Sequence, residues 1–547
     1  MRTFASLAFS GSFTSYDPAH PLVGRMVANT EFAKALFHHG SFESYCFFIG
    51  ENREREEVRR AFLDTGLIEE SRLRLRNLLE LPGCLERGDL SLLHHHSNLE
   101  CFLDLVWLRD QYSRCSVPVT AQLHSLSYPR ELGTYLRALL WPPSASDGVF
   151  CSSEPGRQVV EGCLAGLSDE LREAGHGASR GEWELAVVPL GVDVDALQRG
   201  DGLAMRRELG IEPEAFVVLC IARFSEYDKM DLFPLLQAFQ GLVRRARGST
   251  RPPLLLLAGS RQETRTPEML MLWARMLRIQ DRVKLRVNFA EPEKRHLLAA
   301  ADLFVSPCDN PQETFGLSVV EAMAAGLPVV VSDFDGYRDT VTDEVGIRIS
   351  TRMGELSFLR DIGPLLHERP LHLFLAQNVE VDLAELEQAL FELHVDHARR
   401  AGMAQAAGKR ARSLYDWKVV IARYEEVWRR LSESRAVRRR ARHPLGLDFQ
   451  RVFAHYPSAE LCQQDVVSAS AAGRLMCGGS NHYPVYPELS NLFSDDEVVA
   501  VVRAAQDRPK PIDVMLGVIR GVAADRPEWH ARYLLTWLLK HGLLVRR

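Results

Sequence analysis

The sequence predicts an α/β protein with two doubly wound, Rossmann-like domains that face a cleft, followed by a small, mostly helical domain. Short apolar strands alternate with helix-forming segments in two successive series, which is the pattern of parallel sheets covered by helices. The chain has 547 residues, enough for two to four domains. The predicted divisions are residues 1–192, 193–415 and 435–547. A ligand is expected in the cleft, at the carboxyl ends of the strands.

The first domain, residues 1–192, opens with a strand predicted at residues 3–11. A polar loop then leads to Gly24, and a helix is expected from there to about His39, because apolar residues recur at nearly helical spacing. The remaining strands are expected at the apolar runs 44–49, 90–95, 117–123 and 148–152.

The second domain, residues 193–415, repeats the alternation. Its strands are expected at the apolar runs 216–222, 253–258, 283–287, 303–306 and 329–332.

Charge and cysteine usage narrow the class of protein. The net charge of −6 excludes a broad attraction to nucleic acids or anionic membranes. Ten cysteines are scattered without a Cys-x-x-Cys pair, which favours free thiols in a reducing compartment. The N-terminal residues lack the long apolar region of a signal peptide, and no apolar run approaches the length of a membrane span. The expected location is therefore the cytoplasm.

The stretch Ser306–Glu321, SPCDNPQETFGLSVVE, carries the strongest functional signal. An apolar strand passes into an apolar helix predicted over residues 317–325, which ends at Gly326. Glu313 is predicted in the loop before this helix, and Glu321 about two turns into it. Free backbone N–H groups at the helix start favour an anion. A phosphate site beside carboxylates suits a ligand with phosphate at one end and hydroxyls at the other, and a nucleotide sugar is such a ligand.

Glu313 to Ala325 match the signature E-x-F-G-L-x-x-x-E-A-M-A, and the Gly326-x-Pro328 that follows extends the match. On these residues the chain resembles the retaining glycosyltransferases of family 4, which have the GT-B fold. The resemblance runs from about residue 3 to residue 431. Within it, residues 188–193 look like the interdomain linker of the family.

Two further segments are interpreted through this resemblance. Residues 416–431 look like the helix that crosses back onto the first domain. Residues 352–379, rich in Leu and Phe, are longer than the family pattern. They are interpreted as an acceptor-side element or as additional core.

The resemblance implies a site for the donor diphosphate. Arg223 and Lys229 follow a predicted strand and look like the cations of the family motif G-R-x-x-x-x-K-G, although Ala222 and Met230 replace its glycines. Gly24 looks like the second glycine of a Gly-Gly loop whose first position is Val23 here; a plain turn glycine is the alternative. The amides expected to join the cations are those of Phe315, Gly316, Leu317 and Ser318.

The remaining roles are also implied by the resemblance. Glu313 would hydrogen-bond the sugar hydroxyls near the anomeric carbon, and Glu321 the ribose hydroxyls. His124 looks like the T-x-H histidine that contacts the transferred sugar, with a satisfied strand-end histidine as the alternative. His94–His96 are interpreted as structural, or as acceptor-side for His96, because adjacent strand residues point to opposite faces and cannot all bind one metal ion. Asp339 is interpreted as a helix-start cap.

The implied function is transfer of a sugar from a nucleoside diphosphate to an acceptor hydroxyl, with retention and without a metal ion or other cofactor. A UDP-sugar is the expected donor and a GDP-sugar the alternative. The acceptor, a saccharide, lipid or protein, stays open. Competing hypotheses are a non-catalytic nucleotide-sugar-binding scaffold, and a phosphorylase or epimerase on the same fold.

The last segment, residues 435–547, lies outside the resemblance. It contains a capping box at Ser494–Glu497 and ends in a helical pattern at 529–544, which favours a small helical module with a winged-helix-like shape. Acceptor recognition or self-association are its hypothetical roles. The run Arg438–Arg442 before it is interpreted as a solvated linker, with contact to an acidic partner or membrane phosphate as the alternative.

Overall fold

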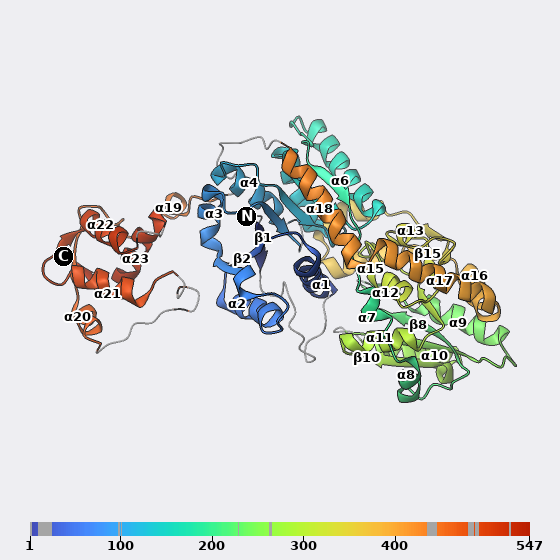
Figure 1. Cartoon of the computed structure of the whole chain (residues 1–547). Helices are drawn as coiled ribbons and strands as arrows, with labels where there is room; N and C mark the ends of the chain where they lie inside the picture. Colours follow the sequence, from blue (N-terminus) through green and yellow to red (C-terminus); the bar gives the residue numbers. More distant parts are fainter. Residues whose placement is uncertain are drawn as a thin grey trace.

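The structure is a computed structural model of the chain (Figure 1). It describes residues 3–8, 24–96, 99, 101–227, 229–261, 265–434, 446–479, 486, 489, 492–523 and 527–547. Two parallel sheets, each covered by helices, form the two large domains, as the sequence predicts.

The first domain is built on a seven-stranded parallel sheet in the order β3-β2-β1-β4-β5-β6-β7. Its strands are β1 (Thr3–Ala8), β2 (Ser44–Ile49), β3 (Leu73–Asn77), β4 (Leu92–His95), β5 (Val119–Gln122), β6 (Gly148–Cys151) and β7 (Glu184–Val187). Its α-helices are α1 (Gly24–His39), α2 (Asn52–Val58), α3 (Leu81–Arg87), α4 (Phe102–Tyr112), α5 (Pro129–Leu140) and α6 (Glu154–Glu173).

The second domain has a six-stranded parallel sheet in the order β10-β9-β8-β11-β12-β13. Its strands are β8 (Phe216–Ile221), β9 (Pro253–Gly259), β10 (Val283–Val287), β11 (Leu303–Ser306), β12 (Val329–Ser332) and β13 (Gly346–Ile349). Its α-helices are α7 (Val194–Leu197), α8 (Gly202–Glu208), α9 (Phe233–Arg245), α10 (Thr266–Met276), α11 (Lys294–Ala299), α12 (Leu317–Ala324), α13 (Tyr337–Thr340), α16 (Leu383–Val395) and α17 (His397–Leu414).

The predicted strands form at the expected places, and three edge strands of the two parallel sheets were not predicted. The unpredicted strands are β3, β7 and β13, each with polar or charged residues and only partly buried. Their mixed composition hides them from a search for apolar runs. Residues 9–11 of the first predicted strand lie outside the described residues. Gly24 begins α1 itself, so it is a helical residue and not a loop residue before the helix.

Helix α18 (Trp417–Glu433) crosses from the second domain back to the first (Figure 1). Asp416 caps its start, because the carboxylate accepts a hydrogen bond from Lys418 N at 3.0 Å. The apolar face of α18 joins the core of the first domain. For example, Trp428 packs against Phe4 with ring centroids 5.8 Å apart and donates its indole N–H to Thr120 Oγ1 at 3.1 Å.

Residues 352–379 form a compact addition to the second domain. The strands β14 (Thr351–Met353) and β15 (Val379–Val381) pair antiparallel, and between them lie α14 (Phe358–Ile362) and α15 (Glu368–Ala376). This segment reaches the first domain. His372 on α15 is buried, and its Nε2 lies 3.2 Å from the carbonyl oxygen of Ser127. It therefore joins the two domains on the side of α5.

The C-terminal region is a separate helical module with its own apolar core. It contains α19 (Phe449–Val452), α20 (Ala471–Cys477), α21 (Asp495–Ala504), α22 (Ile512–Val522) and α23 (Glu528–Lys540) beside the antiparallel strands β17 (Lys510–Pro511), β16 (Val466–Ala469) and β18 (Leu544–Arg546). Figure 1 shows it at the end of the first domain that is away from the second domain.

One predicted feature of this region is present in the structure. The capping box at Ser494 and Glu497 forms at the start of α21. The winged-helix-like shape stays a prediction, and the run Arg438–Arg442 lies outside the described residues. Across the part of the chain that the structure describes, no helix is long and apolar enough to cross a membrane.

The packing of α18 gives a stability prediction. Trp428→Ala should lower the free energy of unfolding by about 3–5 kcal/mol, because the side chain is buried and leaves a cavity among aromatic rings. Urea unfolding followed by circular dichroism measures this. The control is Arg429→Ala, an exposed residue of the same helix, with an expected change within about 0.5 kcal/mol. Equal effects of the two variants would contradict the structural role of α18.

Candidate functional site

A cavity of about 490 Å³ lies between the two large domains. The first domain contributes residues of α1 and of the segment after β5, and the second contributes residues that follow β8, β9, β10 and β11. These are carboxyl ends of parallel strands, where α/β folds hold their ligands. The cavity therefore lies where the sequence places the site.

The cavity brings together most of the residues that the resemblance singles out. Its lining includes His124, Arg223, Lys229, Glu313, Phe315, Leu317, Ser318 and Glu321. The lining residues that come from α1 are Val27 and Ala28, one turn into the helix that Gly24 begins. Gly316 does not line the cavity and acts instead as the backbone turn that starts α12.

The turn at Gly316 requires glycine. Its φ of 88° is left-handed, and a Cβ at this position would lie 2.3 Å from Cε1 of Tyr337. Tyr337 is buried, and its hydroxyl shares a hydrogen bond of 2.7 Å with Ser306 Oγ at the end of β11. The close packing of Gly316 on this ring fixes the direction in which α12 leaves the loop.

Glu313 occupies part of the helix start. Its Oε1 accepts hydrogen bonds from Gly316 N at 2.8 Å and from Phe315 N at 3.4 Å, and its Oε2 forms an ion pair with Lys229. The expectation of four open amides is therefore wrong for these two. Among the described residues, the amides of Leu317 and Ser318 donate to no protein acceptor. Ser318 Oγ is likewise buried without a hydrogen-bond partner there. These groups remain available to an anion.

Glu313 and Lys229 each stabilise the charged form of the other. Burial acts to raise the pKa of Glu313, but the Lys229 ammonium and the backbone N–H groups outweigh it, so the pKa lies below its usual range. For Lys229, burial lowers the pKa, but the carboxylate of Glu313 outweighs burial and raises it. Both groups are therefore ionised at neutral pH.

Glu321 has a partner that sequence reasoning missed. Lys294, the first residue of α11, donates to Glu321 Oε1 at 2.8 Å and also forms an ion pair with Glu291 of the turn Glu291–Glu293. All three residues line the cavity. The lysine follows an acidic run, E-P-E-K, which is typical of a solvated surface, so the sequence carried no signal for a buried cation.

The histidines near the cleft differ in their surroundings. His124 lines the cavity, and its Nε2 lies 3.1 Å from the carbonyl oxygen of His96. His94 is buried, with Nδ1 2.9 Å from Thr120 Oγ1 and Nε2 3.0 Å from His96 Nδ1. His96 stacks on Phe32 with centroids 3.6 Å apart. Burial lowers the pKa of His94 and His96 well below the usual value, so both are neutral.

No group of His, Cys, Asp or Glu suited to a metal ion occurs among the described residues.

Contacts beside the cavity tie the two domains together. The carbonyl oxygen of Thr314, the residue after Glu313, accepts hydrogen bonds from Ser153 Oγ at 2.7 Å and Ser152 Oγ at 3.3 Å. Asp339 caps a helix, but not the one that contains it. Its carboxylate accepts from Glu154 N at 2.5 Å, at the first turn of α6 in the other domain. The loop between β11 and α12, which carries Glu313 and Thr314, therefore contacts both domains.

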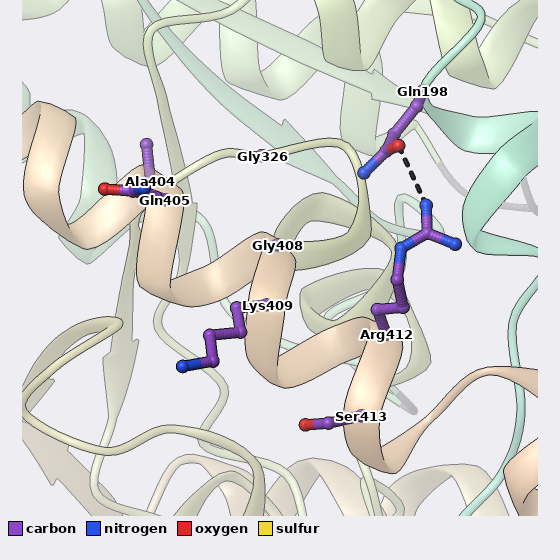
Figure 2. Close-up of a pocket in the computed structure, with 8 residues that line it drawn as sticks. All are labelled: Gln198, Gly326, Ala404, Gln405, Gly408, Lys409, Arg412 and Ser413. Carbon is purple, nitrogen blue, oxygen red and sulfur yellow. Dashed lines mark hydrogen bonds between the residues drawn. The ribbon is translucent and has the colours of Figure 1, made fainter.

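A second hollow lies at the other end of α12, around α17 (Figure 2). Gly326, Gly408 and Ala404 form part of it, and Figure 2 shows Arg412 joined to Gln198 by a hydrogen bond, which is 3.0 Å long. None of the predicted site residues lines this hollow. It has no counterpart of the carboxylates and helix start of the interdomain cavity, and we assign it no role.

Comparison with known proteins finds similarity over most of the second domain. Residues 203–378 match the family described as Glycosyl transferases group 1. A D-inositol 3-phosphate glycosyltransferase of Segniliparus rotundus is 32% identical over 197 residues, which are 35% of this chain and 42% of the relative. One of Kineococcus radiotolerans is 28% identical over 377 residues, 66% of this chain and 80% of the relative. Over these residues the chain is therefore similar to group 1 glycosyltransferases.

Solved structures show the fold. Sucrose-phosphate synthase from Thermosynechococcus elongatus superposes with a TM-score of 0.51 at 17% identity, over 79% of this chain and 99% of that one. Anabaena HepE in complex with UDP gives 0.51 at 17% identity, over 78% and 99%. The two Rossmann-like domains therefore have the GT-B arrangement.

A buried carboxyl group in the loop between β11 and α12 predicts how the stability of the protein depends on pH. Burial raises the pKa of Asp309 from 3.8 to about 8. The folded state then holds a proton that the unfolded state has lost, so stability falls as pH rises from about 4 to about 8. Asp309→Asn should remove this loss and raise the free energy of unfolding at pH 8 by roughly 2–4 kcal/mol, with little change at pH 4. Thermal unfolding at the two pH values measures this. A gain of equal size at both would contradict it.

Proposed function

We propose that the protein transfers a sugar from a UDP-sugar to an acceptor hydroxyl, with retention of configuration at the anomeric carbon and without a dedicated metal ion. The observation that supports this best is the convergence of Arg223, Lys229, Glu313 and Glu321 around the start of α12 in one interdomain cavity. Cations and open amides at one end suit a diphosphate, and carboxylates suit the hydroxyls of two sugars.

The diphosphate is the leaving group, so its charge must be stabilised as the bond breaks. Lys229 and Arg223 supply positive charge, and the amides of Leu317 and Ser318 lie at the positive end of the α12 dipole. Ser318 Oγ adds a hydrogen-bond donor that has no protein acceptor among the described residues. This arrangement gives a phosphate group fixed partners without a metal ion.

In the proposed complex the transferred sugar lies between the domains, near Glu313 and His124, which both line the cavity. In the proposed step the bond between the anomeric carbon and the phosphate oxygen breaks. The acceptor oxygen forms the new bond on the same face, and its proton passes to the departing phosphate oxygen. No residue serves as a covalent nucleophile, which agrees with a front-face, retaining reaction.

The donor and acceptor are proposed from the relatives. HepE is described in complexes with UDP and with UDP-glucose, so UDP-glucose is the first donor to assay and a GDP-sugar the alternative. The relatives named above are called D-inositol 3-phosphate glycosyltransferase, so this cyclitol phosphate is the first acceptor to assay. The proposed location is the cytoplasm, where nucleotide sugars and free thiols are both expected.

Nucleotide binding and turnover test the proposal together. UDP should raise the melting temperature of the wild type by mass action, and Glu321→Ala should lose that shift. Release of UDP from UDP-glucose should then depend on an added acceptor, and NMR of the product reports the anomeric configuration. Binding without turnover on a broad acceptor panel would favour a non-catalytic scaffold, and an inverted product would overturn retention.

The contact between Glu313 and Lys229 gives a less obvious prediction. In the structure Glu313 holds the lysine and two amides that stand at the diphosphate site, so UDP must compete with its carboxylate. Glu313→Gln should therefore bind UDP more tightly, by roughly three- to tenfold in Kd, which is about 0.7–1.4 kcal/mol. Its rate of transfer should fall by roughly a hundredfold or more.

Isothermal titration calorimetry with UDP and a coupled assay of UDP release measure the two effects. Glu293→Gln is the matched control, because this residue pairs with Arg286 outside the cavity. Weaker UDP binding by Glu313→Gln would show that the carboxylate helps to hold the nucleotide rather than competing with it.

A further inference from the structure

Lys294 is a buried cation beside the proposed ribose-binding residue. It is 9% exposed, and so is Glu321. Its ammonium donates to Glu321 Oε1 at 2.8 Å and pairs with Glu291 as well. A smaller hollow of about 230 Å³ lies beside the main cavity. Lys294, Glu321 and Glu291 line both of them.

The position of this lysine is unfavourable for a cation. Lys294 begins α11, where the helix dipole repels positive charge, and burial adds a cost of desolvation. The two carboxylates offset both costs. Burial lowers the pKa of Lys294, but Glu321 and Glu291 outweigh it and raise the pKa, so the side chain stays charged. A surface lysine would avoid these costs, so its burial here calls for a reason in the site.

Glu321 faces several charged groups. Besides Lys294 on α11 and Glu291 on the preceding turn, the carboxylate of Glu31 approaches from α1 of the other domain. Burial raises the pKa of Glu321, Lys294 lowers it, and the two other carboxylates raise it again. Lys294 is the one cation among these partners. The adjoining hollow adds Asp193 and Arg295 at its wall.

The hydrogen bond from Lys294 uses one oxygen of Glu321. Among the described residues no hydrogen bond reaches Oε2, so that oxygen remains as an acceptor at the cavity. An ionised carboxylate can accept from both hydroxyls of a ribose, whereas a protonated one loses much of that capacity.

We propose that Lys294 is a positioning residue for the nucleotide, which holds Glu321 ionised and oriented so that it accepts the ribose 2′- and 3′-hydroxyls. This rests on the proposed function, because it assumes a ribonucleotide in the cleft. Lys294 acts through Glu321 and sets the preference for ribose over sugars that lack these hydroxyls.

The test compares UDP with 2′,3′-dideoxyuridine 5′-diphosphate. The ratio of their Kd values isolates the contribution of the hydroxyls, because the titration of the diphosphate affects both ligands alike. Calorimetry at pH 6.5, 7.5 and 8.5 on the full chain gives this ratio for the wild type and for Lys294→Met. In the wild type it should be roughly tenfold or more and nearly constant with pH.

In Lys294→Met the ratio should fall to about one to three at pH 6.5 and recover toward the wild-type value at pH 8.5. The sign follows from the charges. Without its cation, Glu321 stands beside Glu291 and Glu31, so its pKa rises and it is protonated at low pH. Raising the pH ionises it again and restores acceptance of the hydroxyls.

The controls separate this role from a structural one. Lys409→Met removes a lysine from the exposed face of α17, at the hollow of Figure 2, and should leave the ratio unchanged. On a Glu321→Gln background, Lys294→Met should have no further effect on the ratio. If Lys294→Met does not fold, Lys294→Gln, which keeps a donor of similar length but no charge, takes its place.

The possible results distinguish a failure of the role proposed for Lys294 from a failure of the proposed function. A ratio that is the same in the wild type and the Lys294 variant at every pH overturns the inference while leaving the proposed function intact. A ratio that falls equally at every pH shows that Lys294 maintains the shape of the site and not the charge of Glu321, which also overturns it. Absence of UDP and GDP binding to the wild type overturns the proposed function itself, and the inference with it.

Discussion

The left-handed turn at Gly316 is the constraint on which the rest of the cleft depends. A residue with a side chain there would collide with the buried ring of Tyr337, and the turn could not form. With glycine, α12 starts directly behind the loop that carries Glu313, and its axis points its N-terminal end at the cavity. The same loop contacts the first domain through the carbonyl oxygen of Thr314. The turn therefore fixes the direction of the helix start and also the position of a contact between the two domains.

Two pairs of opposite charge stand on either side of this helix start. Lys229 pairs with Glu313 in front of α12, and Lys294 pairs with Glu321 on its flank. A buried carboxylate without a cation would be protonated or would destabilise the fold, so the lysines allow carboxylates to be present in a shielded cleft. The pairs differ in what a ligand does to them. Under the proposed function, a diphosphate would compete with Glu313 for Lys229, whereas the ribose hydroxyls would require no change in Lys294.

The sequence predicted the parts of the site that depend on local patterns. The apolar runs located most of the central strands. The order of strand, loop and helix placed Glu313 before the start of α12 and Glu321 after it. The edge strand β3 (Leu73–Asn77) was missed, although β10, an edge strand with a similar alternation of apolar and basic residues, was predicted. A short alternation of this kind on a half-exposed strand is a weak signal. Lys294 was missed because burial is a tertiary property. A lysine within E-P-E-K has the local pattern of a surface turn.

Partners across domains were also beyond the sequence. Asp339 was interpreted as a helix-start cap, and its carboxylate does accept a hydrogen bond at a helix start, but the helix is α6, which is remote in the chain. Likewise Glu313 was assigned to the sugar alone, and the structure shows that it also holds the cation expected for the phosphates. Motif spacing fixes which residues share a loop or a helix. It carries no information on which charged groups from separate loops meet in the folded structure.

These contacts balance the charges that the cleft brings together. A site built to bind a dianionic diphosphate has an excess of positive charge, and cations and open amides that face each other across a narrow cavity destabilise the fold. Glu313 reduces this excess from within the motif itself, since it neutralises Lys229 and satisfies two amides at the helix start. Under the proposed function, part of the binding energy of the donor would be used to release Glu313. The released carboxylate would then stand next to the sugar, so that donor binding and preparation of the sugar site would become one event.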